Sequence, residues 1–160
     1  MDITSISAVI AAISVVVGVI FAIFQMRDAN KSRHTDLIIQ LNPALKVTMS
    51  EVIESYSKIM NLEFKDYKEY LEKYGDPLSD TALQLTTGYN DGFGFLLHKQ
   101  LIDIETIDYI LVGSTIGLWE KLKPLIEGMR KHNNLPELSK WFEYLYNELK
   151  KREQTTQAQK

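Results

Sequence analysis

The sequence contains no cysteine, and only three histidines and four prolines occur among its 160 residues. The absence of cysteine excludes disulfide bonds, thiolate metal sites and a cysteine nucleophile. No two histidines are four residues apart, which excludes the helical histidine pair of a zinc site. The formal net charge is −3. A chain without a large basic field is not expected to bind nucleic acid.

Charged residues are also missing from the start of the chain. Residues 3–24 are uncharged and rich in Ile, Val, Phe and Ala. As a helix they would span roughly 33 Å, which matches a hydrocarbon core of about 30 Å. A cleaved signal peptide has a basic start, a shorter apolar run and a cleavage site between small residues, and this segment has none of these. The sequence therefore predicts a single transmembrane helix at residues 3–24.

The basic residues next to this segment predict its orientation. Arg27, Lys31 and Arg33 come after the segment, and no lysine or arginine precedes it. Because positive charge near a membrane helix favours the cytoplasmic side, we expect the N-terminus outside and the rest of the chain in the cytoplasm. The predicted location is the cell (plasma) membrane, with a single span and contact with membrane lipid.

One face of the predicted membrane helix carries small residues. At about 100° per residue they fall within about 80° of arc. Small side chains let a second helix approach closely, so this face is a predicted partner-binding surface. The pattern leaves open whether the partner is another copy of the chain, which would give a homo-oligomer, or a different protein. The residues are Ser7, Ala11, Ser14, Gly18 and Ala22.

The remainder of the sequence has helical periodicity throughout and no strand-like segment. Its fold class is predicted as all-α: the N-terminal transmembrane helix followed by a cytoplasmic bundle of five or six helices. The layout is a membrane helix at 3–24, a helical stalk at 25–41, a helical domain at 42–150 and a disordered polar tail at 151–160. Within the domain, helices are predicted at 44–61, 64–74, 78–100, 104–112 and 115–131, with a last helix after a capping box at 134–137. Asn42 and Pro43 are the predicted cap and first-turn proline of the first of these helices, and Asp103 is the predicted cap of the helix at 104–112.

Several residues of the helical domain match a known pattern. They are Tyr89-Asn90-Asp91-Gly92-Phe93, Leu101-Ile102-Asp103, Gly113, Trp119-Glu120, Pro124, Arg130 and Phe142-Glu143-Tyr144-Leu145. In these residues the chain resembles a family of short bacterial and archaeal proteins of unknown function, found in methanogens among others. The chain departs from the family's pattern at two places: the family often has an acidic residue near the position of Gly92 and a glycine near that of Gln100. The resemblance implies an N-terminal membrane anchor and a helical domain, and it implies no activity.

The sequence contains no convincing set of catalytic groups. The glycine-rich segment 88–94 lacks the Gly-Lys-Ser/Thr ending of a phosphate-binding loop, and no strand precedes it. Its glycines permit either close helix crossing or a partner surface. Trp119, Glu120, Arg130 and Glu143 are predicted to form an ion-pair cluster between the last two helices. We therefore predict no catalytic residue, no cofactor and no metal site.

The predicted function is a non-catalytic accessory or regulatory subunit that docks on a larger integral membrane protein complex. Its predicted cytoplasmic contacts are Tyr89, Gly92, Phe93 and His98. For His98 the alternatives are a ligand, a pH-sensitive contact and an ordinary histidine at a helix end. The occurrence of the family in methanogens suggests, by extension, an inhibitory or protective role on a membrane-bound methyl-transfer complex. The alternatives are a self-associating membrane scaffold and a membrane-tethered sensor of a small ligand.

Overall fold

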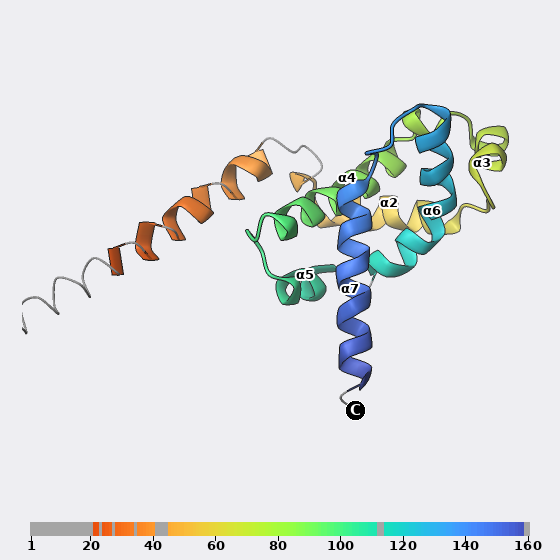
Figure 1. Ribbon diagram of the computed structural model, residues 1–160. Coiled ribbons are helices and arrows are strands. Elements are labelled where there is room, and N and C mark those ends of the chain that lie inside the picture. The colour runs from red at the N-terminus through yellow and green to blue at the C-terminus, as the bar shows by residue number, and fades with distance from the viewer. Residues whose placement is uncertain are drawn as a thin grey trace, which may run out of the picture. The chain divides into compact units, whose positions relative to one another are not determined.

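The computed structural model describes residues 21–22, 24–26, 28–33, 35–40, 45–111 and 114–158 (Figure 1). The chain divides into two units, Met1–Leu37 and Ile38–Lys160. The described residues of the first unit are helical. Within the described part of the chain, no helix is both long enough and apolar enough to cross a membrane. The predicted transmembrane segment 3–24 lies almost entirely outside the described residues and stays a prediction.

The second unit is all-α where the structure describes it, as predicted. Its elements are α2 (Met49–Asn61), α3 (Tyr67–Tyr74), the 3-10 helix η2 (Pro77–Ser79), α4 (Thr81–His98), α5 (Ile104–Leu111), α6 (Ser114–His132) and α7 (Lys140–Ala158). The most extensive pairing is between α4 and α7, and α2 packs on α4. Buried side chains form one cluster around Trp119, Leu122 and Phe142 and a second around Tyr89, Ile107 and Leu145.

Local capping decides where several of these helices begin. Asp103 caps α5, as predicted, because its Oδ1 accepts a hydrogen bond from the Thr106 amide at 2.7 Å. The prediction for α2 was wrong by several residues. Its N-cap is Thr48, which forms a reciprocal capping box with Glu51. Residues 45–48 are consequently outside the helix, and Asn42 and Pro43, the predicted cap, lie outside the described residues.

The start of α7 is also different from the prediction. Residues 134–137 do not cap this helix, which begins at Lys140 after two residues with positive φ, Asn134 and Ser139. The Asp91 carboxylate of α4 takes the place of the cap. Its Oδ1 accepts hydrogen bonds from the Trp141 and Phe142 amides, both at 3.0 Å. These amides belong to the first turn of α7 and have no partner within the helix.

Close contact between α4 and α7 depends on a glycine. A Cβ atom at Gly94 would overlap the backbone carbonyl group of Trp141. Of the two alternatives for the glycine-rich segment, close helix crossing is therefore the role of Gly94. In Figure 1, α7 passes across α4.

Ion pairs join α7 to its neighbours along its length. Arg130 of α6 pairs with Glu143 at 2.8 Å, as predicted, and its guanidinium lies 6.0 Å from the centre of the Trp119 ring. Glu120 is not part of that cluster, because it pairs with Lys150 at 2.9 Å.

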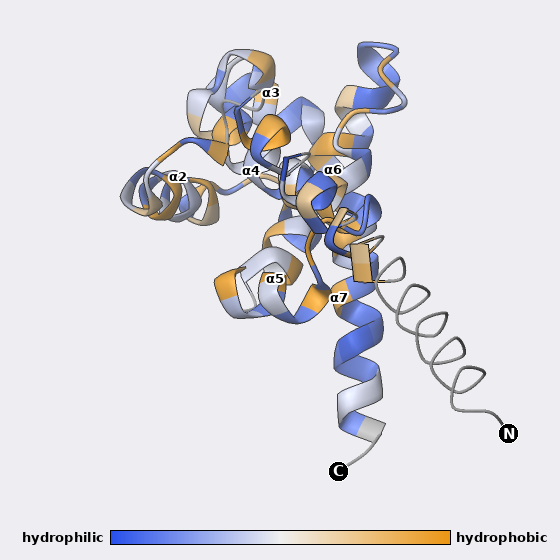
Figure 2. Ribbon diagram, turned by 90° about the vertical axis from the view of Figure 1, so that its left-hand side faces the viewer, coloured by the Kyte–Doolittle hydropathy of each residue, from blue (hydrophilic) through white to orange (hydrophobic). Residues whose placement is uncertain are grey.

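The end of α7 differs from the predicted disordered tail. The helix continues to Ala158 (Figure 2) without glycine or proline. Arg152 pairs with Asp108 and Glu105 of α5 at 3.3 and 3.4 Å. The Thr155 and Thr156 hydroxyls donate to carbonyl groups one turn earlier. These contacts extend the helix through residues 151–158.

Substitution of Gly94 tests the close contact of the two helices. We expect Gly94→Ala to lower the free energy of unfolding by about 1–3 kcal/mol, because the added methyl group meets rigid backbone. Gly117→Ala is the matched control, since nothing lies within 4 Å of a Cβ there. In that open helical position alanine stabilises by about 0.5–1 kcal/mol. Urea unfolding followed by circular dichroism measures both changes, and equal effects of the two variants would contradict the contact.

The Asp91 cap predicts a pH-dependent stability. Burial raises the pKa of Asp91 above its ordinary value of 3.8, and this outweighs the opposing effect of the two amide donors and of Lys140 and Arg130. The folded state therefore favours the protonated carboxyl group. This contribution to stability is complete below pH 3.8 and is lost as the pH rises through the folded-state pKa.

The variant Asp91→Asn isolates this effect, because the amide oxygen still accepts the two hydrogen bonds but does not titrate. Unfolding free energies of both chains, measured from pH 3 to pH 8, give their difference. We expect the stability of the wild type relative to Asp91→Asn to fall as the pH rises through this window and then to level off. A relative stability that is constant or increases with pH would contradict the assignment.

Candidate functional site

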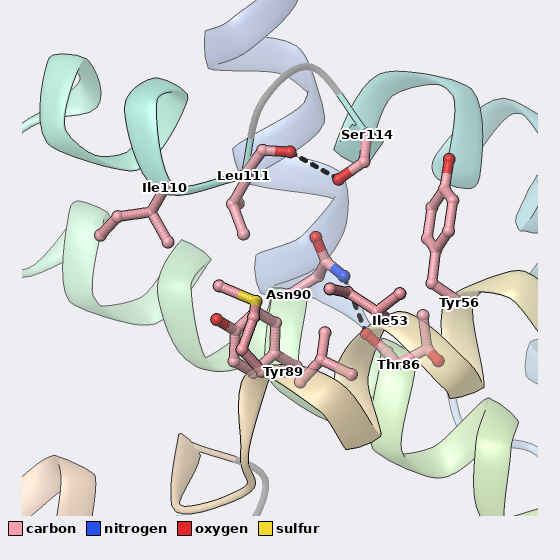
Figure 3. Close-up of a pocket in the computed structure, with 10 residues that line it drawn as sticks. Ile53, Tyr56, Thr86, Tyr89, Asn90, Ile110, Leu111 and Ser114 are labelled. Atoms are coloured by element: carbon pink, nitrogen blue, oxygen red, sulfur yellow. Dashed lines mark hydrogen bonds between the residues drawn. The ribbon is translucent and has the colours of Figure 1, made fainter.

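A cavity of about 350 Å³ lies between α2 and α5, with α4 as its floor (Figure 3). Its walls are mainly apolar. We call it the α2–α5 pocket. It is lined by Met49, Val52, Ile53 and Tyr56 of α2, Thr86, Tyr89 and Asn90 of α4, Ile110 and Leu111 of α5, and Ser114.

The polar side chains at the floor of the pocket are hydrogen-bonded within the domain. The Asn90 Nδ2 donates to the Thr86 carbonyl oxygen at 2.8 Å, and the buried Thr115 hydroxyl donates to Asn90 Oδ1 at 3.0 Å. The Ser114 hydroxyl donates to the Leu111 carbonyl oxygen at 2.6 Å. Because buried polar groups are costly without partners, these bonds hold the floor in one arrangement.

The described lining of the pocket carries no charged side chain. None of the described residues that line it is Asp, Glu, Lys, Arg or His. Burial raises the pKa of the Tyr89 hydroxyl above 10.0, so this group stays protonated. The Tyr56 and Tyr89 hydroxyls are the polar groups that lack a hydrogen-bond partner among the described residues. The pocket is therefore suited to an uncharged, mainly apolar group.

Beside the pocket, α2 exposes a row of large apolar side chains. Met49, Ile53 and Met60 are 53%, 58% and 36% exposed. At about 100° per residue they lie within about 40° of one another on the helix. We call this row the α2 stripe. On the side of the helix away from Ile59, the stripe is bordered by the exposed Ser50 and Ser57. Hydrophobic segments are visible along α2 in Figure 2. Within residues 45–111 and 114–158, no other helix covers this face.

The predicted cytoplasmic contact residues are divided between the core and the surface. Tyr89 and Gly92 are buried. The half-buried Phe93 ring packs against Tyr89 with its centre 4.9 Å away. For these three residues the structure favours the packing alternative, and Tyr89 also lines the pocket. His98 is exposed, away from the pocket, with its ring 4.3 Å from Trp141 and 5.5 Å from Tyr144.

The predicted membrane-face residues are mostly not described. Ser7, Ala11, Ser14 and Gly18 lie outside the described residues, and Ala22 is helical and exposed. The partner surface predicted on this helix stays a prediction.

The sequence pattern predicted a helix over 44–61 and did not identify the pocket. The available signal is the width of the apolar face. The apolar residues from Ile59 through Val52 and Tyr56 to Ile53 cover about 120° of the helix. One edge of this arc, including Ile59, is buried, and the other is the exposed α2 stripe. An arc this wide indicates contact with more than one partner element.

The pocket and its surroundings do not form a recognisable catalytic centre. Asp91, the half-buried carboxylate of α4, faces α7 and is bonded to its amides. In the described ranges, no group of three or more His, Asp or Glu side chains is arranged to hold a metal ion. The arrangement can bind an apolar group by excluding water, and no described Asp, Glu, His, Lys or Arg side chain lines the cavity.

Comparison with known proteins gives a family and no activity. The family described as a domain of unknown function (DUF4760) matches residues 12–149. The chain has no significant match among the curated proteins or among the solved structures.

The hydrogen bonds of the pocket floor predict the effect of a substitution in α6. Thr115→Val keeps the shape of the side chain but leaves the buried Asn90 Oδ1 without its donor, and we expect a loss of about 1–3 kcal/mol in unfolding free energy. Thr155→Val is the control, because its hydroxyl is exposed near the end of α7. That change should stay within about 0.5 kcal/mol. Similar urea midpoints for the two variants would contradict the role of Thr115.

Proposed function

The chain belongs to the DUF4760 family, whose function is unknown, and we propose that it is a non-catalytic interaction subunit held at the cell membrane by residues 3–24. Its helical domain docks on a larger membrane protein complex. The docking surface is the α2 stripe with the α2–α5 pocket beside it.

The observation that carries this proposal is the exposure of large apolar side chains at the mouth of an apolar cavity. Met49 and Ile53 are each more than half exposed, although both line the pocket. Burial of apolar surface stabilises by about 25 cal/mol per Å², so leaving these side chains in water forgoes that gain. A contiguous apolar surface beside a pocket is typical of a site that another protein covers.

The chemistry of the pocket supports a binding role over a catalytic one. General acid–base and nucleophilic catalysis require a titrating or nucleophilic group within hydrogen-bond reach of the reacting atom. The pocket is lined by apolar residues, bonded amide and hydroxyl groups, and two tyrosines. An interaction subunit needs a stable surface, and the bonded floor of the pocket supplies one.

The membrane location rests on the sequence at the N-terminus. The uncharged residues 3–24 are long enough to cross a bilayer, and Arg27, Lys31 and Arg33 favour a cytoplasmic position for the helical domain. In this proposal the small-residue face with Ser7 and Ala11 contacts a membrane helix of the same complex. The partner is therefore an integral membrane protein that also has a cytoplasmic surface.

Self-association is the alternative use of the small-residue face. Because the chain has no cysteine, a single cysteine placed at Ala11 reports on this face alone. A high yield of disulfide-linked homodimer would favour a membrane scaffold made of identical chains. Cross-links to other proteins only would favour the accessory subunit.

A charge placed in the α2 stripe tests the docking surface. We expect the wild type to migrate with a larger assembly on a native gel after gentle detergent extraction, and Ile53→Asp to migrate as the free chain. Loss of a central apolar anchor costs about 2 kcal/mol or more, roughly thirtyfold in affinity. Leu135→Asp is the control, since Leu135 is 43% exposed in the turn before α7. A wild type that runs only as a free monomer would contradict the proposal.

A further inference from the structure

The α2–α5 pocket opens directly onto the α2 stripe. Met49 and Ile53 belong to both, because each lines the cavity and each is more than half exposed. A partner that covers the stripe therefore also closes the pocket. If the partner closes the pocket without placing a group in it, a void of about 350 Å³ remains or water is trapped against apolar walls. Both outcomes are less stable than a filled cavity.

The lining of the pocket determines the charge of its occupant. None of the described lining residues is Asp, Glu, Lys, Arg or His, and the side-chain groups of Thr86, Asn90 and Ser114 already bond within the domain. A charged group inserted here would lose its hydration without gaining an opposite charge, which costs several kcal/mol. The occupant is consequently uncharged and mainly apolar.

The size of the pocket limits the occupant further. Ligand pockets in proteins span about 300–1,000 Å³, so a cavity of about 350 Å³ is at the lower end of the range. A nucleotide or an extended cofactor also needs charged or strongly polar contacts that are missing here. One large side chain, such as that of Trp, Phe, Met or Leu, matches the chemistry and enters the cavity without filling it.

The shape of the surface around the pocket indicates what carries this side chain. Met49, Ile53 and Met60 form a ridge along about 17 Å of the axis of α2. Ridges of this kind pack into the grooves of another helix. Recognition by strand addition requires an exposed sheet edge, and residues 45–111 and 114–158 include no strand. The partner element that fits the ridge is an α-helix.

Resting on the docking role proposed above, we propose that the α2–α5 pocket is an anchor site for one large uncharged apolar side chain of a partner helix. The helix lies along the α2 stripe, and its anchor residue inserts between α2 and α5 onto the floor formed by Tyr89 and Asn90. This side chain determines the specificity of the interaction. A charged residue at its position would be buried without an opposite charge, and a much smaller one would leave the cavity empty.

Methionine methyl resonances give a direct test, because the chain has five methionines in different environments. The experiment uses the full chain in lipid nanodiscs, ¹³C-labelled at the methionine methyl groups, with indole as a neutral probe of side-chain size. We expect indole to shift the Met49 resonance saturably and to leave the buried Met129 unchanged. Indole-3-acetate and tryptamine, which carry opposite charges, should bind at least tenfold more weakly. Equal shifts at Met49 and Met26, or equal binding of the charged analogues, would overturn the anchor site.

Variants that fill the pocket test whether the anchor site is needed for docking. Val52→Phe and Ile110→Phe each place a ring in the cavity from opposite walls, and an unchanged Met129 resonance verifies the fold. We expect either variant to abolish the indole shift and to release the chain from the larger assembly on the native gel. If the assembly persists with a filled pocket, docking stands and the anchor site is overturned. If the wild type forms no assembly, the proposed function itself fails.

Discussion

The bond between the Asp91 carboxylate and the first turn of α7 fixes the arrangement on which the rest of the domain depends. The Trp141 and Phe142 amides at that turn have no helical partner, and Asp91 satisfies both from a helix about fifty residues earlier in the chain. The absence of a side chain at Gly94 lets the two backbones meet one turn further along α4. A carboxylate and a glycine therefore set both the register and the distance of the α4–α7 pair.

This pairing also decides what α4 presents on its other face. With Asp91 and Gly94 directed at α7, Thr86, Tyr89 and Asn90 form the floor of the α2–α5 pocket. Thr115 of α6 holds Asn90 in place, and Arg152 of α7 holds α5 through Asp108 and Glu105. The pocket is thus a consequence of how the bundle is tied together, and its floor is as rigid as the bundle. A rigid apolar site loses little conformational entropy when a partner binds.

The sequence predicted most of what local chemistry determines. Helical periodicity identified the helices, Asp103 was recognised as a cap, and Arg130 and Glu143 were expected to join α6 and α7. The start of α7 was not predictable from neighbouring residues, because its cap comes from Asp91, which is remote in sequence. The pocket was missed for a related reason. A pattern such as Met49, Val52, Ile53 and Tyr56 shows which face of a helix is apolar, but it does not show which helix, if any, covers each edge of that face.

The central claim is that the α2 stripe is covered in the native assembly. Hydrogen exchange along α2 is its most direct test. Exchange is measured by mass spectrometry on the full chain in the extracted assembly and on the purified chain in nanodiscs. A helix covered by a partner opens less often, so its amides exchange more slowly. The account predicts slower exchange of residues 49–61 in the assembly and unchanged exchange of α3. Equal exchange of α2 in both states, or equal protection of α3, would contradict it.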